Sequence, residues 1–241
     1  MRVFAIAPDQ VRQTRSLVLV RWPLPIVVSP GAVVPVCVFA LIFVAFSGTT
    51  SPSMLAATAL LGGIGGIISL VIHELGHVSI SRRLSGVRPE KVSVMCLGAA
   101  AHFEGEYRNG REQARMALGG PEASFAFALA LTIPLFLPAP GSLKIAALAL
   151  ALLNGAIGAL SLLPVHPLDG HKVVVGLVWW AIGSEDRARG LVRRVGKGLL
   201  AVDLSFAVLL LAERPALGLT VIAIAAVAYC QKRFVRAPRT T

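Results

Sequence analysis

The chain alternates between long apolar runs and short connections that carry most of its charged residues. Six apolar runs can be distinguished. A hydrocarbon core of about 30 Å needs roughly 20 apolar residues in a helix, so the third and fourth runs are long enough to cross it. The last two are short, and we expect them to be tilted or partly interfacial. The runs are Val27–Phe46, Met54–Ile80, Met116–Leu137, Leu143–Leu163, Leu199–Ala212 and Ala216–Cys230.

Composition agrees with this pattern. Of the 241 residues, 56% are hydrophobic and only 15% are charged, and the mean hydropathy is +0.76. Soluble domains are far less apolar. We therefore predict an all-α polytopic membrane protein with about six transmembrane helices. One exception is expected, a small membrane-associated β-hairpin between the second and third spans.

The net charge of +11 is explained by topology. Of the 23 Lys and Arg residues, all but Lys144 and Arg214 lie in every other connection or at the two ends. This is the positive-inside pattern, which predicts a multi-pass protein of the cell membrane, of the bacterial inner-membrane type, with both termini in the cytoplasm. The basic residues favour contact with anionic lipid and argue against a nucleic-acid partner.

The runs also predict the domain organisation. We expect a single membrane-embedded domain over residues 1–241, with a core at about 54–182, a cytoplasmic amino-terminal segment at 1–25 and accessory helices at 199–231. Lys91–Tyr107, between the second and third runs, has β-branched residues in rough alternation and predicts the hairpin. Such a hairpin could offer a strand edge to a substrate.

The second run contains polar residues that a membrane span rarely tolerates. Its sequence HELGH places His73 and His77 four residues apart, on one helical face, about 6 Å from each other, with Glu74 beside them. Two imidazoles at this spacing can hold zinc, and the glutamate can take a proton from a water on the metal. Because ionisable groups in a membrane are costly, a bound cation would explain why three occur together.

A hydrolytic zinc site needs a third protein ligand. The candidates in apolar sequence are Asp169, His166, His171 and Asp203. Asp169 lies in SLLPVHPLDGHKVV, where two prolines interrupt an apolar run. A broken helix can turn a carboxylate towards a cavity. Sequence alone leaves the choice open, and it does not assign a role to either flanking histidine.

Together these motifs resemble the site-2 protease family of intramembrane zinc metalloproteases. HELGH is similar to the family's first motif and PVHPLDG to its second, and the resemblance extends over about 60–182. It implies that His73, His77 and Asp169 bind Zn²⁺ and that Glu74 is the general base. It also implies cleavage of transmembrane or membrane-proximal segments of substrate proteins, as in regulated intramembrane proteolysis.

The resemblance has two departures. Ser124 stands where the family usually has the asparagine of G-P-x-x-N, and Ser161 stands where it usually has that of N-x-x-P-x-P. A serine hydroxyl reaches less far and has one donor rather than two, so we expect altered substrate preference more than altered catalysis. We take Ser124, Asn154, Ser161 and Gly98 as candidate substrate-binding residues.

An alternative function class is a membrane zinc transporter or a non-catalytic regulator. Glu74 argues against it, because a transporter needs no base beside two ligands. The expected partners are the lipid bilayer, a membrane-protein substrate with a transmembrane segment and a regulatory membrane protein.

Overall fold

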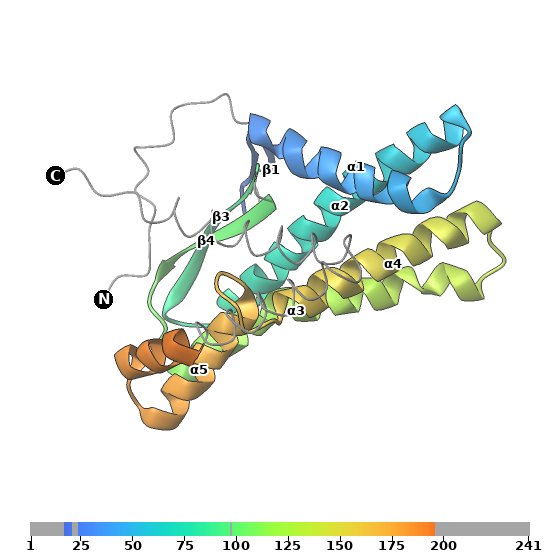
Figure 1. Ribbon diagram of the computed structural model, residues 1–241. Coiled ribbons are helices and arrows are strands. Elements are labelled where there is room, and N and C mark those ends of the chain that lie inside the picture. Colours follow the sequence, from blue (N-terminus) through green and yellow to red (C-terminus); the bar gives the residue numbers. More distant parts are fainter. Residues whose placement is uncertain (1–16, 21–23, 97, 196–241) are drawn as a thin grey trace. The chain divides into compact units, whose positions relative to one another are not determined.

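The computed structural model describes residues 17–20, 24–96 and 98–195 (Figure 1). These divide into two compact units. The first contains 17–20, 24–96, 98–108 and 115–161, and the second contains 109–114 and 162–195. The predicted runs Leu199–Ala212 and Ala216–Cys230 lie outside the described residues, so the count of six spans stays a prediction.

Within the described residues, four helices are long and apolar enough to cross a membrane. They span Pro30–Ser47, Pro52–Ser81, Gly110–Phe136 and Gly141–Ser161, and each corresponds to one of the first four predicted runs. Within these spans lie α1 (Val33–Ser47), α2 (Pro52–Ser81), α3 (Gly110–Leu131), the short 3₁₀ helix η3 (Ile133–Phe136) and α4 (Gly141–Ser161). Large apolar side chains such as Leu41, Phe46 and Leu129 point outwards. A surface of this kind suits lipid rather than water, so the chain is a membrane protein.

A glycine ends α1 and a proline begins α2. Gly48 terminates α1 in the left-handed conformation, with φ 63°. Pro52 begins α2, where its missing N–H has no helical partner to lose. The two helices then run side by side in Figure 1. Gly62 and Gly66 allow this, because a Cβ at either position would collide with Phe43 or Phe39 of α1. The glycines of LLGGIGG therefore pack helices together.

A four-stranded sheet lies against the carboxyl-terminal part of α2. Its order is β1 (Leu17–Val20), β2 (Ile26–Val28), β3 (Val87–Met95) and β4 (Gly98–Gly105). The pairing of β2 with β3 is parallel and the other two pairings are antiparallel. Val92 of β3 packs on Val78 of α2 in a small buried cluster with Leu24. This contact brings β4 alongside the part of α2 that carries the polar motif.

The sheet corrects two sequence expectations. An antiparallel pair does lie between α2 and α3, but it starts at Val87 rather than Lys91, and it belongs to a larger sheet than a hairpin. Val27 and Val28 belong to β2, so the first apolar run begins as a strand and becomes a helix only after Pro30. Association of the β3–β4 pair with the membrane stays a prediction.

In the second unit, α5 (Asp169–Ile182) follows the proline-interrupted segment predicted from SLLPVHPLDG. It ends at Gly183, which is left-handed with φ 70°. Residues 185–195 are also helical, and Ala188 and Val192 bury themselves against Val175 of α5. The amino-terminal end of α5 thus presents Asp169 in a helix first turn, where the helix dipole favours a carboxylate.

Candidate metal centre

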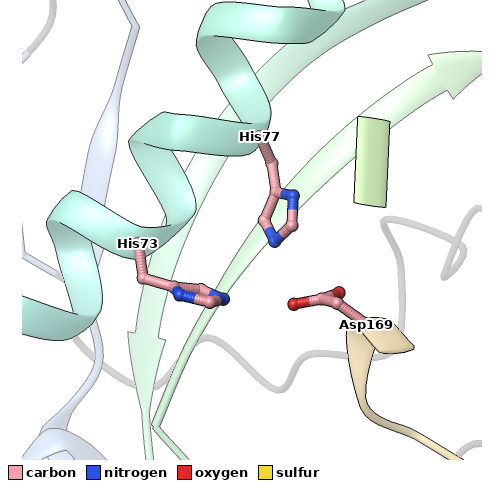
Figure 2. A group of neighbouring side chains, drawn as sticks. All are labelled: His73, His77 and Asp169. Atoms are coloured by element: carbon pink, nitrogen blue, oxygen red, sulfur yellow. The ribbon is translucent and has the colours of Figure 1, made fainter. Parts of the chain in front are cut away.

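His73 and His77 lie on one face of α2, as their spacing predicts. Both are buried, each with 6% of its surface exposed, and their ring centroids are 5.2 Å apart. Figure 2 shows the two rings leaving the helix on the same side. Two imidazoles in this arrangement can coordinate a single cation.

Residues of helix α3 lie within hydrogen-bond distance of Nδ1 of each histidine ring. His77 Nδ1 lies 2.8 Å from the carbonyl oxygen of Met116, and His73 Nδ1 lies 2.9 Å from Ser124 Oγ. A carbonyl only accepts, so His77 carries its proton on Nδ1 and donates it. Gly120 N also lies 3.2 Å from this nitrogen, but a protonated nitrogen cannot accept, and the shorter Met116 contact decides the assignment. His77 Nε2 therefore keeps a lone pair for a metal.

The Nε2 atoms of both histidines face Gly120 of α3. A Cβ built at Gly120 would collide with His73 Nε2 and with His77 Nε2. The space beside the two nitrogens thus exists because this residue has no side chain. Close contact between α2 and α3 depends on glycine as well, since a Cβ on Gly76 would collide with the backbone of Gly119.

Glu74 joins α2 to the sheet. Its Oε2 accepts a hydrogen bond of 2.8 Å from the backbone N–H of Ala101 in β4. The carboxylate is half-buried. The carboxylate next to His73 in the sequence is therefore held by the strand that lies along its helix.

Asp169 is buried, with 7% of its surface exposed, and Lys172 Nζ lies 2.8 Å from its Oδ1. It is one of three buried side chains of ligand type, with His73 and His77, and one ligand atom from each lies within 4.8 Å of the others (Figure 2). Two imidazole nitrogens and one carboxylate oxygen are a donor set of catalytic zinc sites, in which a fourth position stays open. The donor atoms of these three residues fit a zinc ion.

The four candidate substrate-binding residues lie in different surroundings. Ser124 is fully buried and contacts His73. Asn154 is fully buried in α4 and donates to Ser69 Oγ of α2 at 2.9 Å and to the carbonyl of Leu150. Ser161 donates to the carbonyl of Gly158 in its own helix. Gly98 begins β4 with φ 117°. Their substrate contacts stay predictions.

The remaining histidines lie outside this group. His166 and His171 contact each other, with ring centroids 5.4 Å apart. His102 lies in β4 opposite Lys91. Burial, and next the cation of Lys91, lower the pKa of His102 below its ordinary value. The sequence left His166 and His171 open as alternatives to Asp169 and assigned neither of them a role.

Sequence reasoning missed three contributions to the site. The carbonyl of Met116, the bare Cα of Gly120 and the backbone N–H of Ala101 all belong to the main chain. Side-chain motifs do not reveal such groups. The one available signal was Gly120, which stands at the glycine of G-P-x-x-N in the family resemblance.

Comparison with known proteins supports the zinc interpretation. No family model matches the chain. A "Putative zinc metalloprotease sll0528" of Synechocystis is 32% identical over 133 residues, which are 54% of this chain and 34% of that protein. A "Putative zinc metalloprotease Rip3" of Mycobacterium tuberculosis is 34% identical over 146 residues, which are 57% of this chain and 37% of that protein. The chain thus spans about a third of the length of these relatives.

The structural comparison covers nearly the whole chain. A site-2 protease from Methanocaldococcus jannaschii superposes with a TM-score of 0.59 over 94% of this chain and 98% of that one, at 21% identity. The chain has the site-2 protease fold. This fold agrees with the resemblance stated from HELGH and PVHPLDG.

Proposed function

We propose that the chain is a zinc-dependent intramembrane endopeptidase that cuts transmembrane or membrane-proximal segments of other proteins. One observation supports this above all others: on a span-length helix, His73 Nε2 and His77 Nε2 both lie against Gly120 of α3, and Glu74 follows His73 directly. The names of the relatives, zinc metalloproteases, agree with hydrolysis.

The proposed roles follow from donor chemistry. His73, His77 and Asp169 would hold Zn²⁺ through two nitrogens and one oxygen. When bound, zinc lowers the pKa of a coordinated water and polarises a carbonyl. Glu74 would take the proton of the attacking water and later give it to the nitrogen of the leaving amine. Its anchor on Ala101 keeps the carboxylate at a fixed position while it does so.

Water and protons would come from the cytoplasm. Arg82 and Arg83 follow α2 directly, and basic residues mark the cytoplasmic side. At about 1.5 Å per residue, His77 and His73 lie roughly 8 and 14 Å from Arg82 along the helix. Such a depth is below the lipid surface and still within reach of a water-filled entrance.

The edge of β4 would receive the substrate. Val92 N donates to the carbonyl of Pro25, and the carbonyl of Val94 accepts from Ser29, so both residues turn their backbone groups towards β2. Their partners in β4, Ala101 and Ala99, therefore turn theirs away from β3. The N–H of Ala101 already donates to Glu74, so the N–H that this edge would offer to a substrate is that of Ala99. Among the described residues, β3 is the only strand that pairs with β4. An unwound substrate segment could pair with this edge and expose a carbonyl to the site.

Co-expression with tagged single-span membrane proteins tests the proposal. The wild-type chain should release a fragment that disappears with a membrane-permeant zinc chelator. Glu74→Gln should release none and should still bind zinc. Glu122→Gln is the matched control, because it makes the same change at an exposed position of α3, and it should cut normally.

The outcomes separate the two function classes. Full cleavage by Glu74→Gln would contradict the role of this residue as a base. Zinc uptake that is unchanged in Glu74→Gln, with no fragment from any substrate, would support a transporter or regulator instead. A regulatory membrane partner would appear as cleavage that depends on a second co-expressed protein.

A further inference from the structure

Three residues of α3 form a stripe that faces the two histidines. Met116, Gly120 and Ser124 are four residues apart, so they share one face of the helix. The first offers a carbonyl to His77, the second leaves a space at both Nε2 atoms, and the third offers a hydroxyl to His73. One helical face thus contacts both rings at their inner nitrogens and at their outer ones.

The stripe reaches the rings because α2 and α3 approach closely. A Cβ on Gly76 would collide with the carbonyl of Gly119, and a Cβ on Gly119 would collide with Gly76 in turn. With the two helices this close, Ser124 Oγ lies 2.9 Å from His73 Nδ1.

The hydrogen-bond partners of the two rings differ in how firmly they fix which ring nitrogen carries the proton. Met116 offers a carbonyl, which can only accept, and this fixes the His77 proton on Nδ1. Ser124 Oγ can accept or donate. His73 Nε2 faces the space over Gly120, as His77 Nε2 does. For both Nε2 atoms to offer lone pairs to one cation, His73 must also carry its proton on Nδ1 and donate it to Ser124.

We propose that Ser124 is a positioning residue for His73 rather than a substrate-binding residue. Its fully buried hydroxyl accepts the Nδ1 proton and directs the Nε2 lone pair towards the space over Gly120. This inference rests on the proposed zinc function. Removal of such a partner behind a metal-binding histidine weakens metal affinity about 10- to 100-fold.

Zinc affinity in lipid nanodiscs provides the test, with a fluorescent chelator as competitor. We expect Ser124→Ala to bind zinc about 10- to 100-fold more weakly than the wild type. Ser124→Thr keeps the hydroxyl and should restore most of that affinity. Ser81→Ala is the matched control, since Ser81 is also fully buried but donates only within its own helix, to the carbonyl of Val78. The thermal stability of the metal-free protein should fall equally in Ser124→Ala and Ser81→Ala.

A second readout reports the proton itself. In metal-free protein with ¹⁵N-labelled histidine, the His73 signals, assigned by their loss in His73→Gln, should show a proton on Nδ1. Ser124→Ala should shift them towards the Nε2-protonated form, while Ser81→Ala should leave them unchanged. A general packing defect would not move this signature.

The results distinguish the inference from the function on which it rests. If Ser124→Ala binds zinc as tightly as Ser81→Ala and keeps the Nδ1 proton, the positioning role is wrong. If the wild type binds zinc but cuts no substrate, the proposed function is wrong and the positioning role stands. If the wild type binds no zinc, both are contradicted.

Discussion

Of the three proposed ligands, Asp169 is the one that the sequence alone could least identify. The spacing of His73 and His77 is local, so the helix that they share could be predicted from the motif itself. Asp169 belongs to another segment, and only the family resemblance separated it from His166, His171 and Asp203. The structure groups Asp169 with His73 and His77, and its role as a ligand stays a prediction.

Replacement of Asp169 tests its role. Asp169→Asn removes the negative charge and keeps the shape, so zinc affinity should fall more than the roughly 10- to 100-fold expected for an outer partner. The free energy of unfolding of the metal-free protein should change by less than about 1 kcal/mol, because Lys172 is half-exposed and such ion pairs contribute little. Chelator competition and thermal denaturation measure the two effects. Asp186→Asn changes an exposed carboxylate and should alter neither.

Gly120 offers a second test among single residues. Gly120→Ala puts a methyl group where both Nε2 atoms lie, so zinc binding should be lost. Overpacking of this kind should also destabilise the protein by about 1–3 kcal/mol, although alanine favours a helix by about 1 kcal/mol. Gly155→Ala in α4 meets no atom within 4 Å, and it should keep full zinc affinity. Tight zinc binding by Gly120→Ala would refute the proposed location of the metal.

Elements were predicted well where their pattern is local. The apolar runs gave the first four helices, and the alternation after Lys91 gave an antiparallel strand pair. Strands β1 and β2 were missed because their short apolar sequences, LVLV and IVV, have no period of their own. Ile26–Val28 becomes a strand by pairing with Val92–Val94, which lie far away in the chain. The contacts that Met116, Gly120 and Ser124 of α3 make with the two histidines were also missed, because they join segments far apart in the chain.

Strand β4 yields a prediction at the scale of elements. Ala99 turns its N–H away from β3, so Ala99→Pro should remove one edge donor and keep the ladder with β3. Loss of one hydrogen bond, about 0.5–1.5 kcal/mol, should slow substrate cleavage by up to about tenfold. Zinc affinity should not change. Ala99→Ser keeps the N–H and should cut at the wild-type rate.

Cleavage rates of a single-span substrate measure this effect, with zinc content checked in each variant. Equal rates for Ala99→Pro and Ala99→Ser would show that the substrate does not pair with this edge. A loss of zinc in Ala99→Pro would instead show that the substitution had disturbed the metal centre, through the hydrogen bond between Ala101 and Glu74.

For the whole molecule, the distribution of charge predicts the orientation in the membrane. Ser85 follows α2 in a connection rich in Lys and Arg. Ser142 lies at the start of α4, where Lys144 is the one basic residue nearby. In a chain without Cys37, Cys96 and Cys230, an impermeant maleimide added outside spheroplasts should label Ser142→Cys and spare Ser85→Cys. The opposite labelling would reverse the orientation and place the entrance to the site on the outer side.

The central claim is that side chains of α2 and α5 hold one zinc ion within a membrane-embedded fold. X-ray absorption at the zinc edge of protein in nanodiscs, combined with metal analysis, tests it most directly. The account predicts one zinc per chain, with two nitrogen ligands and one carboxylate oxygen at about 2.0–2.2 Å, and loss of the ion in His77→Ala. Purified protein without zinc, or a zinc ion that His77→Ala and Asp169→Asn both retain in full, would contradict it.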